Sequence, residues 1–237
     1  MSNVYFCSDP HYHHKNIVKG ISNWDDISGC RPFNTIEEHN QTIVNGINNV
    51  VDKDDTLYCL GDWSFGGIDK IWEFRKQINC HNIHLILGNH DHHIENNRTL
   101  RIPITDGYIL EKNFIVSGVN EYIMEFNYNK GINEYLVPCH NLFSSVQHVK
   151  TITIEGHTLF LSHYAHRVWN KSHKGRIHLY GHSHDTLPEY GMSMDVGFDA
   201  AYHLLGEWRP FSFQEIQKIM SNCSIKFVDH HDSNTTE

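Results

Sequence analysis

Short, mostly apolar runs recur along the chain, and a polar residue able to bind metal follows each of them. The runs occupy residues 4–8, 56–60, 82–87, 159–162 and 176–180. Apolar runs of this length, bounded by turn-forming residues, are typical of buried strands. The pattern therefore predicts five core strands, each of which delivers polar side chains at its carboxyl end.

Between and after these runs the sequence carries helix signals. Thr35 and Glu38 have the spacing of a capping box, which predicts a helix from there to about residue 50. A second helix is expected over residues 67–78, and Ser212 with Glu215 repeats the capping-box spacing before a last helix. Strands that alternate with helices predict a layered α/β fold.

The pattern changes in the middle of the chain. Residues 98–150 are rich in Asn, Tyr and β-branched residues, with glycines at turn points, which predicts β-ribbons or loops inserted before the second half. Residues 151–162 have the pattern of a hairpin that turns at Glu155 and Gly156, and residues 192–196 that of a further strand. These segments predict a second sheet.

Length and composition indicate one folded domain. The chain has 237 residues, of which 39% are hydrophobic and 12% aromatic, enough for a substantial core. We predict a single domain over residues 1–237, with the insertion at about 98–150 and a polar, frayed tail from about residue 229.

Several features predict a cytoplasmic location. No apolar run approaches the roughly 20 residues of a membrane span, and no charged segment followed by an apolar one opens the chain as a secretory leader would. The six cysteines show no CxxC spacing, and Cys7 and Cys59 fall inside predicted strands, as small buried hydrophobes do in a reducing compartment. We expect neither a membrane partner nor secretion.

The charge distribution restricts the partners. The net charge is −9, and the lysines and arginines are scattered, which argues against a surface for double-stranded DNA. An anionic substrate would need positive charge at its binding site, which bound cations can supply. The net charge therefore does not exclude an anionic substrate, and the sequence does not indicate an oligomeric state.

Seven candidate ligands follow the five runs. After the first and the last of these runs, two candidate ligands lie two residues apart. In extended backbone, both members of such a pair would face the same side. The carboxyl ends of strands in an open α/β sheet meet at one crevice. Two carboxylates, four imidazoles and one amide exceed the needs of a single zinc and suit two cations that share a carboxylate. The candidates are Asp9, His11, Asp62, Asn89, His163, His182 and His184.

This donor set predicts the cofactor. Oxygen and imidazole ligands without cysteine are compatible with several first-row metals. We predict two divalent ions and favour Mn²⁺, with Fe, Zn, Co or Ni as alternatives.

Five motifs, in order, carry a family resemblance over about residues 3 to 220. They are Asp9-Pro10-His11, Gly61-Asp62, Gly88-Asn89-His90-Asp91, His163 and Gly181-His182-Ser183-His184. Together they resemble the calcineurin-like metallophosphoesterases. The resemblance implies a four-layer α/β/β/α sandwich with two mixed β-sheets. It also implies that one ion is bound by Asp9, His11 and His184, the other by Asn89, His163 and His182, and that Asp62 bridges them.

The resemblance further implies a mechanism. His90 would face the substrate and protonate the leaving oxygen, with Asp91 orienting its ring. Two ions would lower the pKa of a bridging water toward about 7, so that hydroxide attacks phosphorus in line. We expect hydrolysis of a phosphodiester or a small, nucleotide-like phosphomonoester, and favour the diester. The alternatives are a nuclease for single-stranded nucleic acid and a non-catalytic metal-binding scaffold.

The departures from better-known members are informative. Protein Ser/Thr phosphatases carry an arginine shortly after the Gly-Asp motif, which this chain lacks, and purple acid phosphatases have an iron-binding tyrosine where Phe65 stands. Segments 14–17 and 31–33 instead resemble small predicted phosphoesterases of bacteria and phages.

Three further residues are candidates for substrate binding. His14 lies close to the first motif, and the guanidinium groups of Arg31 and Arg167 could bind a phosphate. An ion pair that stabilises the fold explains Arg31 nearly as well.

Overall fold

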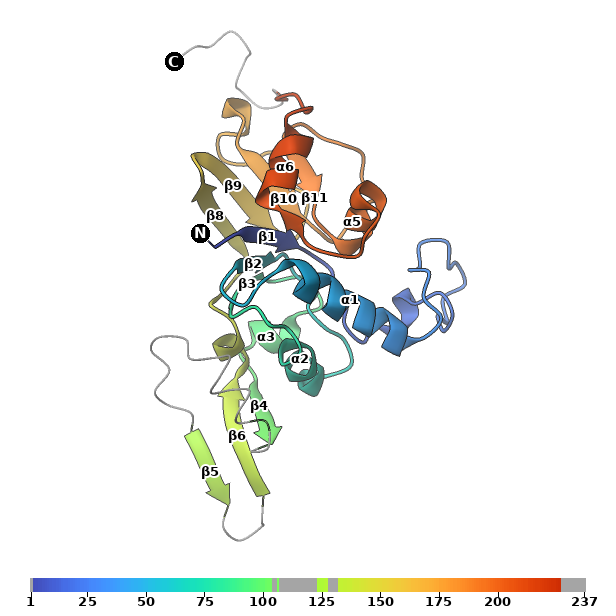
Figure 1. The fold of residues 1–237 in the computed structure, drawn as a ribbon, viewed down its shortest axis with the longest axis vertical. Helices are drawn as coiled ribbons and strands as arrows, with labels where there is room; N and C mark the ends of the chain where they lie inside the picture. The colour runs from blue at the N-terminus through green and yellow to red at the C-terminus, as the bar shows by residue number, and fades with distance from the viewer. Residues whose placement is uncertain (1, 104–105, 107–122, 128–131, 227–237) are drawn as a thin grey trace.

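The computed structural model describes residues 2–103, 106, 123–127 and 132–226. Its first sheet has the strand order β12-β1-β2-β3-β7, in which only β12 is antiparallel to its neighbour (Figure 1). The strands are β1 (Val4–Cys7), β2 (Thr56–Cys59), β3 (Asn82–Ile86), β7 (Ser145–Gln147) and β12 (Phe211–Ser212). Three of the predicted core strands therefore lie side by side and parallel.

The second sheet has the order β11-β10-β9-β8, and β8 is its antiparallel member. Its strands are β8 (Val149–Ile154), β9 (His157–Ser162), β10 (Ile177–Tyr180) and β11 (Ser193–Asp195). Glu155 and Gly156 form the turn between β8 and β9, both with positive φ, as the hairpin pattern predicted.

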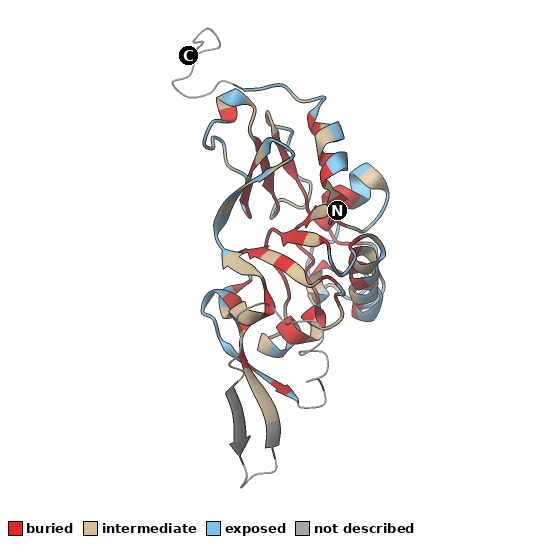
Figure 2. Ribbon diagram, turned by 60° about the vertical axis from the view of Figure 1, so that its left-hand side comes forward, coloured by how far each residue is buried: buried red, intermediate tan, exposed pale blue. Residues whose placement is uncertain are grey.

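A continuous apolar core lies between the two sheets. Phe6 of β1 stacks on Tyr58 of β2, with ring centres 5.4 Å apart, and the same cluster contains Leu159, Leu161 and Leu179 of the second sheet. The red of buried residues in Figure 2 is concentrated in these strands. Burying one such side chain stabilises the fold by about 1.5–3 kcal/mol, so this layer fixes how the two sheets face each other.

The outer face of the first sheet is covered by helices α1 (Ile36–Val50) and α2 (Ile68–Arg75). Thr35 caps α1 by accepting a hydrogen bond from the backbone N–H of Glu38, but the Glu38 carboxylate accepts from Asn34 rather than from Thr35. The predicted capping box at this helix is therefore only half formed. At α6 (Phe213–Met220) the box is complete.

Helices α5 (Phe198–Leu205) and α6 accompany the second sheet (Figure 1). The sequence pattern did not predict α5, because Gly197 precedes it without a side-chain cap. Two mixed sheets accompanied by helices confirm the predicted α/β sandwich. The chain also forms the short helical segments η1 (Lys15–Ile17), α3 (His92–Glu95), η3 (Cys139–Leu142) and η4 (Ser172–Lys174).

A third, antiparallel sheet of order β4-β6-β5 extends from one end of the molecule (Figure 1). Its strands are β4 (Thr99–Pro103), β5 (Ile123–Asn127) and β6 (Ile132–Pro138). The reading of the chain as one domain with an insertion stays a prediction, and the tail from about residue 229 lies outside the described residues. No helix in the described part is long and apolar enough to cross a membrane.

Candidate metal centre

The backbone at the ends of the strands is in a conformation that the sequence pattern did not anticipate. Five of the seven candidate ligands have φ between 47° and 65°: Asp9, His11, Asp62, His182 and His184. The prediction that each i, i+2 pair converges through extended backbone is therefore wrong, because left-handed turns bring the side chains together instead. Such residues cost of order 1–3 kcal/mol each and persist only where the surroundings fix them.

The loops after β1 and β2 are fixed to each other by their backbones. The N–H of Asp9 donates to Gly61 O at 3.0 Å, and the N–H of His11 donates to Asp62 O at 3.1 Å. The N–H of His182 donates to Asp9 Oδ2 at 2.8 Å, which connects the second sheet to the first. The two sheets therefore hold one set of side chains at their common edge.

The first group of donors consists of Asp9, His11 and His184. His11 Nε2 lies 3.6 Å from Asp9 Oδ1 and 3.1 Å from His184 Nε2. One donor atom from each residue lies within 4.8 Å of the others. This is the set that the family resemblance implied for one ion.

The second group consists of Asp62, His163 and His182, again within 4.8 Å. Asn89 lies beside it, with its Oδ1 3.1 Å from His163 Nε2. Asp62 Oδ2 is 3.7 Å from His163 Nε2 and also 3.7 Å from His11 Nε2 of the first group. The structure thus brings all seven predicted ligands together, with Asp62 between the groups.

The chemistry of these donors fits cations. His163 Nδ1 is 2.7 Å from Leu60 O and His184 Nδ1 is 2.7 Å from Asp199 Oδ2, so each Nδ1 donates its proton to an oxygen, and Nε2 of the neutral ring is the atom that can bind a metal. Asp9 Oδ1 is buried and has no hydrogen-bond partner among the described residues. Buried acceptor atoms that face one another without a proton between them are costly, and a bound cation would remove that cost.

The ionisation of the two acids supports the same conclusion. Burial by itself would raise the pKa of Asp9, but the neighbouring imidazoles, His11 first, hold it well below its usual range. Burial, followed by the charge of Asp9, raises the pKa of Asp62 to about 7. A divalent cation between these carboxylates would relieve their repulsion and favour both charged forms.

Two glycines leave the room that the ligands occupy. A Cβ at Gly88 would lie 2.2 Å from Asp62 Oδ1, and one at Gly181 would lie 2.4 Å from Asp9 Oδ2. Contacts this short do not occur, so any larger residue would displace a ligand. The glycines of the Gly-Asn and Gly-His motifs therefore have a steric reason.

Arg31 is a positioning residue rather than a substrate ligand, which corrects the expectation for it. Its side chain has no exposed surface, and it pairs with Asp199 at 2.8 and 3.0 Å and donates to Asp9 O at 2.7 Å. Arg31 holds the pKa of Asp199 below its ordinary value against the effect of burial, and Asp199 orients His184. Sequence reasoning missed Asp199, although it follows the predicted strand at 192–196 just as the candidate ligands follow their strands.

Asp91 also differs from expectation. Its two carboxylate oxygens accept hydrogen bonds from the backbone N–H groups of Asp62, Trp63 and Gly88, each at 2.9 Å. Among the described residues it makes no hydrogen bond to the ring of His90. The prediction that Asp91 orients this ring is therefore corrected. Asp91 instead joins the two loops that carry Asp62 and Asn89.

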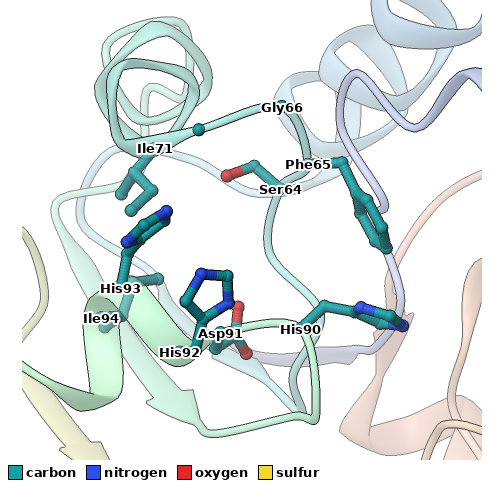
Figure 3. Close-up of a pocket in the computed structure, with 10 residues that line it drawn as sticks. Ser64, Phe65, Gly66, Ile71, His90, Asp91, His92, His93 and Ile94 are labelled. Atoms are coloured by element: carbon teal, nitrogen blue, oxygen red, sulfur yellow. The ribbon is translucent and has the colours of Figure 1, made fainter.

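His90 lies at the border of the donor cluster. Its backbone N–H donates to Asp62 Oδ1 at 2.9 Å, and its ring, 41% exposed, lies with Nε2 4.0 Å from Asp62 Oδ2. The ring centre is 4.3 Å from that of Phe65, and Figure 3 shows the side chain pointing toward Phe65 and away from His93. Burial lowers the pKa of His90.

A cavity of about 660 Å³ opens over the cluster, lined by five of the proposed centre's residues, His11, Asp62, His90, His182 and His184, and by His14. His14 thus lies where a substrate contact requires, and the contact itself stays a prediction. Arg167 lies elsewhere, in a cavity of about 250 Å³ with its guanidinium carbon 5.8 Å from the ring centre of Tyr190. It is not among the residues that line the larger cavity, so its expected role is not supported.

Comparison with known proteins identifies relatives. The chain is 28% identical over 200 residues to the Gene 66 protein of Mycobacterium phage L5, covering 79% of this chain and 80% of the phage protein. It is 38% identical over 93 residues to an uncharacterized protein of Methanocaldococcus jannaschii, covering 38% of this chain and about half (48%) of that protein. A crystal structure of an Aquifex aeolicus protein of unknown function shares the fold, with a TM-score of 0.53, 18% identity and coverage of 92% of this chain and 100% of that one.

The family model Metallophos, which describes the calcineurin-like phosphoesterases, matches residues 2–214. This span contains all five motifs and both donor groups. The match confirms the resemblance on which the ligand assignment was based. The chain therefore belongs to the calcineurin-like phosphoesterases, a family of metal-dependent hydrolases of phosphate esters.

Proposed function

We propose that this protein hydrolyses phosphodiesters with two divalent metal ions, Mn²⁺ by preference, held by the seven ligands described above. The observation that carries the proposal is the convergence of two groups of carboxylate and imidazole donors on the edge shared by the two sheets, with Asp9 Oδ1 buried and without a hydrogen-bond partner among the described residues. Two bound ions supply positive charge for the phosphoryl oxygens and lower the pKa of water toward about 7.

The protein's own residues position the metal ligands and donate a proton. Asp62 lies where the two donor groups meet, and Asp91 fixes the loop that carries Asp62. His90 is partly exposed at the mouth, where its ring N–H can donate to the leaving oxygen. Arg31 and Asp199 fix the ring of His184.

The volume of the cavity favours a diester. A cavity of about 660 Å³ has room for groups on both sides of a phosphate, whereas a monoester requires one. Hydrolysis of monoesters by the same centre is the alternative. A non-catalytic scaffold is disfavoured, because the chain retains both donor groups and His90.

The test compares two substrates on one preparation. Metal-stripped protein is refilled with Mn²⁺ and assayed on bis-p-nitrophenyl phosphate and p-nitrophenyl phosphate, while bound metal is counted by elemental analysis. We expect two ions per chain and faster diester hydrolysis. Asp62→Asn should lose metal and activity, whereas Asp54→Asn, whose side chain is 78% exposed, should keep both. A metal-replete, active Asp62→Asn variant would refute the ligand assignment, and hydrolysis of the monoester alone would refute the diester preference.

A further inference from the structure

A loop at the edge of the large cavity has unusual exposure. The rim loop, residues 19–30, contains three large apolar side chains that are at least 37% exposed: Ile21, Trp24 and Ile27. It lies beside the start of α1 in Figure 1. Of the three, Trp24 also lines the large cavity, where a bound ligand could contact it.

The ends of the rim loop are held firmly. Lys19 N–H donates to Arg31 O at 3.0 Å, Arg31 N–H donates to Ile17 O at 2.7 Å, and Gly20 N–H donates to Phe33 O at 2.9 Å. Ile17 and Arg31 are buried. The loop is therefore exposed in its middle and anchored to the same arginine that positions the metal ligands.

A row of rings leads from the proposed metal centre to this loop. His90 is 4.3 Å from Phe65, Phe65 stacks on His14 at 3.7 Å with an angle of 4°, and Trp24 meets His14 edge to face at 5.8 Å. All four side chains line the large cavity. The cavity wall is thus aromatic from the proton donor to the rim, and the indole at its end is 48% exposed.

The outer part of the cavity also presents an acid. Asp26 lines it and accepts a hydrogen bond from the Ser28 N–H at 2.8 Å, and Asp25 is adjacent and exposed. An ionised carboxylate can only accept hydrogen bonds, so it favours an N–H donor and repels a second phosphate. The occupant suited to this place is planar, uncharged and rich in donors.

We propose that Trp24 and Asp26 bind the nucleobase of a substrate whose phosphate lies at the metal centre, with a preference for a base that carries an amino group. The base stacks on Trp24 and donates to Asp26. This inference rests on the proposed phosphoesterase function and names its substrate class. Base stacking on one aromatic side chain contributes about 5- to 150-fold in affinity.

The test measures binding and turnover separately. Calorimetry of the Mn²⁺-loaded protein compares AMP with ribose 5-phosphate, and kinetics compare the p-nitrophenyl ester of AMP with methyl p-nitrophenyl phosphate. We expect wild type to favour the adenosine ligand in both assays by about 5- to 150-fold. Trp24→Leu should abolish that preference by raising KM for the adenosine ester. Tyr202→Leu removes an equally exposed ring (46%) that does not line the cavity and should behave as wild type.

The outcomes separate the two proposals. Hydrolysis of the methyl ester without any adenosine preference, or a preference that survives Trp24→Leu, would overturn the nucleobase site and leave the phosphoesterase standing. Tighter binding of AMP that depends on Trp24, without hydrolysis of either ester, would support the site and overturn the proposed reaction. Equal binding of both ligands with no hydrolysis would overturn both.

Discussion

Replacing Arg31 should destabilise the protein far more than replacing an exposed arginine. Its guanidinium has no exposed surface and makes two hydrogen bonds to Asp199, with further bonds to Asp9 O and Pro10 O. Arg31→Met keeps much of the volume but leaves the Asp199 carboxylate, only 16% exposed, without its cation. Removing one partner of a buried ion pair costs about 3–5 kcal/mol.

The cost can be measured by thermal unfolding of the metal-free protein. For a chain of this length, 1 kcal/mol corresponds to about 2–4 °C in Tm, so the midpoint should fall by roughly 6–20 °C. Arg101→Met is the control, because Arg101 is 67% exposed and pairs with Glu134 on the surface. That variant should lose no more than about 1 kcal/mol.

A double variant separates stability from positioning. Arg31→Met with Asp199→Leu removes both charges, so it should regain much of the stability that Arg31→Met loses. It should not regain metal affinity, because His184 has lost the acceptor for its Nδ1 proton, a change that costs about 10- to 100-fold. A loss below 1 kcal/mol for Arg31→Met, or full metal affinity in the double variant, would refute this account.

Three other changes test different parts of the structure. His90→Ala should keep its metal by elemental analysis but lose about 10²- to 10⁴-fold in turnover on esters with poor leaving groups; normal turnover would remove His90 from the mechanism. Gly88→Ala should lose metal with an unchanged circular dichroism spectrum, because its Cβ would meet Asp62 Oδ1 at 2.2 Å; full metal binding would show that the loop can move. His178 is buried, and burial lowers its pKa to about 4. The unfolded protein binds a proton at this histidine more readily than the folded protein, so acid lowers the free energy of unfolding. No such loss occurs well above the unfolded pKa of about 6.5, and the loss grows as the pH falls toward 4. Between pH 7 and pH 5 it amounts to about 2 kcal/mol. Urea unfolding of metal-free His178→Leu should show a correspondingly weaker pH dependence, and an unchanged dependence would contradict the assignment.

The ligands could be predicted from the sequence because each depends on a local pattern. Each ligand is an Asp, Asn or His that follows an apolar run. To predict that they converge, one needs only the rule that the carboxyl ends of parallel strands meet at one edge of the sheet. Asp199 and Arg31 could not be paired in the same way, since they are 168 positions apart and meet only when the two halves pack. Asp91 was assigned to the right motif, but its carboxylate has three backbone partners that no sequence spacing reveals. The left-handed turns were not predicted from the sequence either, because neither Asp nor His adopts positive φ often enough to indicate it.

These misses share a physical cause. The residues that sequence reasoning found are those that would touch the ions, whereas the residues that it misjudged hold the ligands in strained turns. Asp91 joins the loops after β2 and β3, and Arg31 joins the loop after β1 to α5 through Asp199. Left-handed backbone at five ligands and a buried cluster of donors both oppose folding. They persist because Arg31 and Asp91, each buried, make several hydrogen bonds from one side chain to different loops. Arg31 and Asp91 therefore hold the proposed ligands in place, whereas the rim loop, for which we propose a role in substrate binding, contacts that arrangement through its anchor at Arg31.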